Sequence, residues 1–80
     1  MNEQQGRKLL PIVNNPEVWE PLKEYLQDQR QLTYRELAVE QSEQVLRRLQ
    51  GKAALLETLE KLPDIVKGFL TNAELDRKRR

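Results

Sequence analysis

The stretch that decides the fold class is residues 43–62, EQVLRRLQGKAALLETLEKL. Apolar side chains recur in it every three or four positions, which is the period of one helix face. The stripe consists of Leu46, Leu49, Ala53 and Leu56, with Leu55, Leu59 and Leu62 beside it. The pattern therefore predicts an amphipathic helix that packs one face against another element.

A weaker stripe precedes it and predicts a first helix. Asn15 can cap this helix, and Pro16 suits its first position. Pro21 lies too deep for the first turn, so we expect either a kink there or a tight turn over residues 16–20. The apolar positions follow a 4-3 spacing, with Gln29 and Glu36 as polar interruptions. They are Val18, Leu22, Tyr25, Leu32 and Val39, broadened by Leu26 and Leu37.

The connection between the two stripes admits more than one interpretation. Residues 39–43 contain neither Gly nor Pro, so one long rod that pairs with other chains is an alternative to two helices. Ser42 can cap a second helix, whereas residues 33–36, TYRE, match a capping box that would place a break earlier. We favour an antiparallel hairpin that turns near residues 40–42. Gly51 marks either the close approach of another backbone or a tolerated surface position.

The two ends of the chain are predicted to differ from its middle. Pro11 disfavours a regular helix in residues 9–13, LLPIV, so residues 1–15 are predicted to form an extended N-terminal arm. Pro63 ends the second helix, and residues 63–80 are predicted to form one or two short helices with a basic tail. A capping-box match at residues 71–74, TNAE, opens the last of them. The predicted fold class is thus all-α, with the hairpin over residues 16–62.

Composition disfavours catalysis and metal binding. The 80 residues include no Cys and no His, so disulfides, the commonest metal ligand and the commonest general base are missing. The acidic clusters, such as Glu17, Glu20 and Glu24, fit a solvated helix face better than a catalytic or metal site. We therefore predict a non-enzymatic protein without cofactor or metal. A chain of this length buries only about 60% of its unfolded surface, which favours association with partners.

Apolar side chains near both ends are the predicted partner-binding residues. For Trp19, the alternative is that it closes the open end of the hairpin. The set is Leu9, Leu10, Ile12, Val13, Trp19, Ile65, Phe69 and Leu70.

The last four residues form a basic tail, for which three interpretations remain. Residues 1–76 carry ten basic and thirteen acidic side chains, a net charge of −3, and the tail reverses the sign. Such a tail can bind an acidic protein surface, can neutralise nucleic-acid phosphates, or can remain solvated. It consists of Arg77, Lys78, Arg79 and Arg80.

No apolar run approaches the roughly 18 residues that a membrane span needs, and residues 1–5 lack a signal-peptide pattern. We therefore expect no membrane partner, and either a cytoplasmic location or assembly in the cytoplasm.

The middle of the chain resembles a family of small helical-hairpin proteins that tailed bacteriophages encode near their capsid and portal genes. The resemblance covers residues 16–63. Its motifs are Pro16 with Trp19, Leu22, Tyr25-Leu26, Leu49-Gln50-Gly51 and Leu62-Pro63.

This resemblance implies a virion structural or assembly accessory protein that docks at a head, portal or neck interface. It implies partners among the phage capsid, portal or neck subunits, multiple copies in an assembly, and a location in the virion and, during assembly, the host cytoplasm. Two alternatives remain: a small regulatory coiled-coil adaptor that binds another protein, and a nucleic-acid-binding accessory that uses the basic tail.

Overall fold

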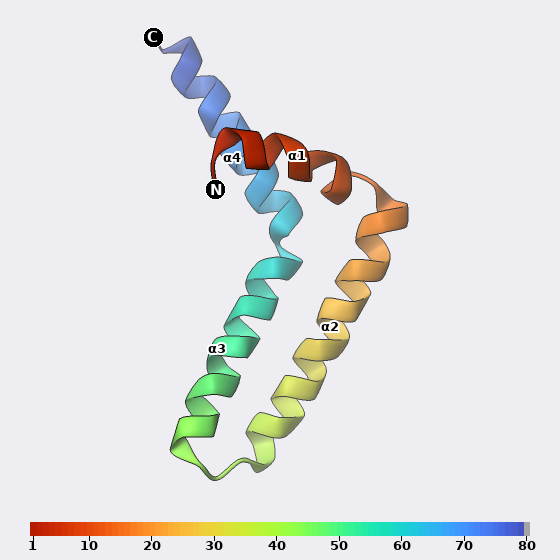
Figure 1. The fold of residues 1–80 in the computed structure, drawn as a ribbon, viewed down its shortest axis with the longest axis vertical. Helices are drawn as coiled ribbons and strands as arrows, with labels where there is room; N and C mark the ends of the chain where they lie inside the picture. The colour runs from red at the N-terminus through yellow and green to blue at the C-terminus, as the bar shows by residue number, and fades with distance from the viewer. Residues whose placement is uncertain (80) are drawn as a thin grey trace. The chain divides into compact units, whose positions relative to one another are not determined.

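The computed structural model describes residues 1–79, which contain four α-helices and no strand. The helices are α1 (Glu3–Val13), α2 (Pro16–Val39), α3 (Glu43–Glu60) and α4 (Leu62–Lys78) (Figure 1). The all-α prediction is confirmed. The chain divides into two compact units, the first comprising Met1–Glu20 and Lys61–Arg80 and the second Pro21–Glu60.

The N-terminal segment is a helix, so the predicted extended arm over residues 1–15 is wrong. Asn2 accepts a hydrogen bond from the backbone N–H of Gln5 at 2.8 Å, and the Gln5 side chain accepts one from the Asn2 N–H at 3.0 Å. This capping box starts α1. Pro11 falls in the last turn, where its missing N–H removes a single intrahelical bond.

The C-terminal segment is one continuous helix, so the predicted break before a short terminal helix is wrong. Pro63 stands in the first turn of α4, where a missing N–H costs nothing. Thr71 does not cap a new helix. Its hydroxyl instead donates to the carbonyl of Lys67 at 2.8 Å, within the continuing helix.

Packing of α1 against α4 forms the core of the first unit. Val66 of α4 is fully buried, and Val13 of α1 is 5% exposed. Gly6 permits close approach of the two helices, because a Cβ atom at this position would lie 3.1 Å from Leu70 Cδ2 and 3.4 Å from Phe69 Cδ1. A larger residue would require these side chains to shift.

The predicted start of α2 is confirmed. Pro16 is its first residue, and the Asn15 side chain accepts a hydrogen bond from the Glu17 N–H at 3.1 Å. Because the helix continues through Pro21, a tight turn over residues 16–20 does not form.

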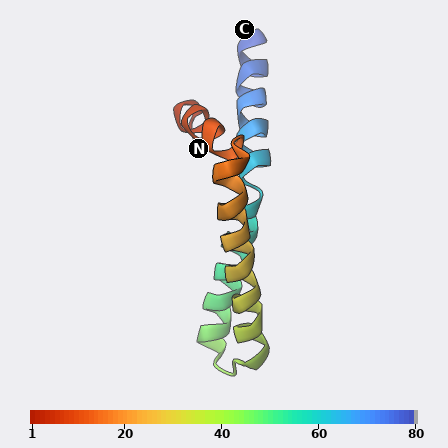
Figure 2. The same ribbon diagram turned by 90° about the vertical axis from the view of Figure 1, so that its right-hand side faces the viewer.

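The second unit contains the rest of α2 and all of α3, which residues 40–42 connect at one end of the pair (Figures 1 and 2). Glu40 stabilises this connection, because its carboxylate accepts hydrogen bonds from the N–H groups of Gln41 (3.0 Å) and Ser42 (2.9 Å). The break therefore lies where the sequence predicts it. The long-rod alternative is wrong, and so is the earlier break at residues 33–36, because the Thr33 hydroxyl donates to the Gln29 carbonyl at 2.8 Å inside α2.

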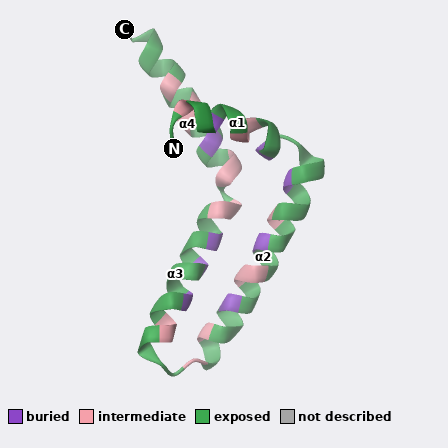
Figure 3. Ribbon diagram, viewed as in Figure 1, coloured by how far each residue is buried: buried purple, intermediate pink, exposed green. Residues whose placement is uncertain are grey.

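The side of α2 that faces α3 is not the predicted one. The buried positions of α2 in this unit are Leu26 and Thr33, whereas those of α3 are Leu49, Ala53 and Leu56 (Figure 3). The α3 stripe is thus confirmed. The α2 stripe is displaced by one residue, which corresponds to about 100° of helix rotation. The residues expected in the contact, Val18, Leu22, Tyr25, Leu32 and Val39, are 41–78% exposed.

Two glycines allow a matched test of the α1–α4 packing. Gly51 has open space around its Cβ position, which agrees with a tolerated surface glycine. Gly51→Ala should raise the free energy of unfolding by about 1 kcal/mol, because Ala has the higher helix propensity. Gly6→Ala should raise the free energy of unfolding clearly less, since its methyl group would contact Leu70. Urea denaturation measures both, and equal gains would contradict the close packing at Gly6.

Candidate protein-docking surface

The orientation of α2 in the second unit follows from one buried residue and its two neighbours. Thr33 is fully buried and therefore faces α3. Leu32 and Tyr34 are each rotated about 100° from it, in opposite senses. The Tyr34 hydroxyl donates a hydrogen bond to the carboxylate of Glu57 on α3. Leu32 consequently lies on the opposite face of the helix pair from the Tyr34–Glu57 contact.

The orientation of α3 follows from its own buried residue in the same way. Leu56 is buried, and Leu55 and Glu57 are rotated about 100° from it in opposite senses. Because Glu57 shares a face with Tyr34, Leu55 shares the other face with Leu32. A row of apolar residues on α2 and Leu55 of α3 thus lie on one and the same face.

We call this surface the apolar face. Its large apolar side chains are all substantially exposed, from 41% for Leu22 to 78% for Val39. Gln29 and Glu36 lie between its α2 members, while Arg48 and Lys52, seven and three residues before Leu55, lie beside its α3 members. The face comprises Leu22, Tyr25, Leu32, Val39 and Leu55, and the half-buried Leu59 borders it.

A hollow of about 310 Å³ adjoins the apolar face along α2. Its four lining residues are spaced i, i+3, i+4 and i+7, which is the spacing of the hole that receives a side chain of a neighbouring helix in a coiled coil. They are Asp28, Gln31, Leu32 and Arg35.

The opposite face of the pair carries polar contacts between its two helices. Arg30 Nε lies 2.7 Å from Glu60 Oε2, and Arg30 Nη2 donates to Glu60 Oε1 at 3.1 Å. The guanidinium also lies 5.9 Å from the ring centre of Tyr34. These contacts fix the rotation of α2 against α3, and so they determine which residues remain on the apolar face.

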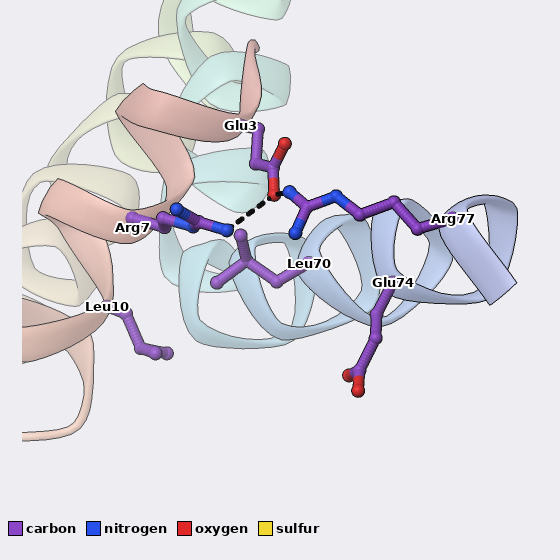
Figure 4. A pocket seen from close by; sticks show the side chains of 6 residues that line it. All are labelled: Glu3, Arg7, Leu10, Leu70, Glu74 and Arg77. Atoms are coloured by element: carbon purple, nitrogen blue, oxygen red, sulfur yellow. Dashed lines mark hydrogen bonds and ion pairs between the residues drawn. The ribbon is translucent and has the colours of Figure 1, made fainter.

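The first unit contains a separate hollow of about 390 Å³ between α1 and α4 (Figure 4). The carboxylate of Glu3 forms ion pairs with both Arg7, at 2.8 Å, and Arg77. Glu74 pairs with Lys78 at 3.5 Å. Leu10 and Leu70 complete the lining. Each charged side chain here therefore has an ion partner, and the single carboxylate of Glu3 is shared by two guanidinium groups.

The predicted partner-binding residues all belong to the first unit, and most of them contribute to packing there. Val13 and Trp19 are buried, at 5% and 6% exposure. Ile12 and Ile65 are exposed. The remaining four are half-buried: Leu9, Leu10, Phe69 and Leu70.

The described residues of the basic tail are already in contact with the chain. Arg77 pairs with Glu3 and Lys78 with Glu74, whereas Arg79 caps α4 through its backbone. Arg80 lies outside the described residues.

Sequence reasoning missed the apolar face as a site, although a signal for it exists. Leu26 and Leu37 stand about 100° from the 4-3 row of α2, and Leu55 stands about 100° from Leu56 on α3. An apolar arc this wide exceeds what one partner helix can cover. A surplus of apolar positions on both helices therefore indicates a second surface.

Within residues 1–79, no three acidic side chains gather into a group that could hold a metal ion. None of the helices there is long and apolar enough to cross a membrane. Comparisons with family models, curated proteins and solved structures find no match.

Tyr34 gives the helix pair a specific pH dependence. The hydrogen bond to Glu57 raises the pKa of the Tyr34 hydroxyl above its ordinary value of about 10. The stabilising contribution of this hydrogen bond is complete below the pKa of Tyr34 in the unfolded chain. It is lost as the pH rises through the higher pKa of Tyr34 in the folded chain.

The melting temperature should thus fall less between about pH 8 and pH 11 in Tyr34→Phe than in the wild type. Tyr25→Phe is the control, because the Tyr25 hydroxyl has no hydrogen-bond partner among residues 1–79. Thermal denaturation followed by circular dichroism measures the difference. An equal fall in melting temperature for the wild type and for Tyr34→Phe would contradict the stabilising role of the Tyr34–Glu57 hydrogen bond.

Proposed function

We propose that this chain is a non-enzymatic accessory protein that works by binding other proteins through the apolar face of α2 and α3. The observation that carries the proposal is the gathering of five large apolar side chains, each at least 41% exposed, on one face of a two-helix unit. Contiguous exposed apolar patches on small proteins mark interaction surfaces.

The energetics of the helix pair support a docking role. Full burial of a large apolar side chain contributes roughly 1.5–3 kcal/mol. The contact between α2 and α3 does not bury most of the apolar surface of the apolar face, so that surface does not stabilise the pair. The same contact buries the polar Thr33 and places the charged Arg30 at its edge. A partner that covers Leu32 and Leu55 would therefore stabilise the unit considerably.

The setting that we propose is the particle of a tailed bacteriophage, at a head, portal or neck interface. The resemblance of Pro16, Trp19, Leu49-Gln50-Gly51 and Leu62-Pro63 to phage helical-hairpin proteins supports it. In this setting, the α2–α3 hairpin docks through its apolar face.

Purified particles provide the test. The wild-type chain should be present at a fixed copy number by quantitative mass spectrometry, and Leu32→Glu should reduce that number at least tenfold, because the new carboxylate would be desolvated in the interface. Ala54→Glu is the matched control, because Ala54 is exposed and lies away from the apolar face. Circular dichroism should show that both variants are helical.

Two results would contradict parts of this proposal. Absence of the wild-type chain from particles would exclude the virion setting. Incorporation of Leu32→Glu at the wild-type level would exclude the apolar face as the docking surface.

A further inference from the structure

We infer that a second copy of this chain covers the apolar face, so that two α2–α3 pairs form a four-helix bundle. The inference rests on the proposed docking role of that face and names its occupant.

The size of the face suits a dimer of two-helix units. At a rise of about 1.5 Å per residue, the 18 residues of α3 span about 27 Å, and two adjacent helices are about 20 Å wide. Two such faces in contact would bury on the order of 1,000 Å², which is near the lower limit for a specific interface. The result is the ordinary architecture of a four-helix bundle, in which each hairpin covers the other.

The order of residues along the two helices can be compared from their shared turn. Because residues 40–42 join α2 and α3 at one end, residues at similar distances from the turn lie at similar levels (Figures 1 and 2). Three pairs of residues on the apolar side are level to within about one helical turn. These are Val39 with Val45, Glu36 with Arg48, and Tyr25 with Leu59.

A two-fold axis parallel to the helices would bring residues at the same level of the two copies into contact. It keeps every residue at its level and sets α2 of one copy against α3 of the other. Glu36 would then meet the basic side chains of Arg48 and Lys52 of the second copy. Above and below this charged layer, Tyr25 would meet Leu59, and Val39 would meet Val45.

The alternative two-fold axis, perpendicular to the helices, fits less well. It would set α3 against α3 in the opposite direction. If this axis crossed the helices near the middle of α3, Lys52 would face the same basic residue of the second copy, and Arg48 would lie against Leu55. Like charges at an interface are repulsive, and an unpaired charge against an apolar residue is desolvated without compensation. We therefore infer the parallel axis.

The charged groups of this layer are available for such contacts. Glu36, Arg48 and Lys52 are exposed, and none of them forms an ion pair within residues 1–79. Exposed ion pairs contribute little energy individually, but complementary charges at an interface select the register and orientation of the partners. The apolar rows would thus supply affinity, and the charged layer would supply orientation.

Analytical ultracentrifugation of the purified full-length chain tests the occupant. The wild type should sediment as a dimer at micromolar concentration, and Leu55→Glu should weaken dimerisation at least tenfold. Ala54→Glu, at the neighbouring residue but turned away from the face, should sediment as the wild type does. Circular dichroism confirms that each variant remains helical.

A charge exchange tests the orientation. Glu36→Lys alone and the double variant Arg48→Glu/Lys52→Glu alone should each dimerise more weakly than the wild type. An equimolar mixture of the two should recover the wild-type affinity, since both α2–α3 contacts of the mixed dimer then pair opposite charges. A perpendicular axis would also pair opposite charges in the mixture, because it sets α3 against α3. It differs for Arg48→Glu/Lys52→Glu alone, which would then exchange one like-charge contact for another and dimerise about as well as the wild type.

A helical wild-type chain that remains monomeric at 100 µM, or a dimer that Leu55→Glu leaves intact, would overturn the inference. A monomer whose incorporation into particles still depends on Leu32 would show that a different protein occupies the face. In that case the inference fails and the proposed function stands. A dimer without recovery in the mixture would overturn the inferred orientation.

Discussion

The contact between α2 and α3 is the constraint on which the second unit depends, because a seam between two helices covers only one narrow stripe of each. On α3 this stripe is the run of Leu49, Ala53 and Leu56, and on α2 it includes Leu26 and the fully buried Thr33. Everything apolar beyond these stripes stays accessible to solvent. The exposed row on α2 is thus a direct consequence of how few residues one partner helix can cover.

In the first unit, the packing of α1 against α4 buries apolar side chains through a closer helix contact. The two helices approach closely at Gly6, and Val66 of α4 is fully buried. The ion pair between Glu3 of α1 and Arg77 of α4 reinforces this contact at its edge. Several apolar residues near the chain ends are therefore engaged in packing, and the large exposed apolar surface lies on α2 and α3. This distribution is the reason for which we place protein binding on the helix pair.

Sequence patterns predicted the helical fold well and the candidate site poorly. The cap at Asn15, the break at residues 40–42 and the α3 stripe depend on local chemistry, which the sequence shows directly. The helix over residues 3–13 was not predicted, because Pro11 disfavours a helix and the Asn2–Gln5 capping box that starts α1 did not enter the prediction. The apolar face was missed because its α2 row was expected in the contact with α3.

By itself, the sequence determined that the chain is helical, where α2 ends and α3 begins, and which side of α3 is buried. The tertiary structure alone decided which of two apolar rows on α2 faces α3. The rows are about 100° apart, and the row that faces α3 is the less apolar of the two, so apolar content alone selects the wrong row. The choice depends on contacts between residues distant in sequence, Arg30 with Glu60 and Tyr34 with Glu57, which fix the rotation of one helix against the other.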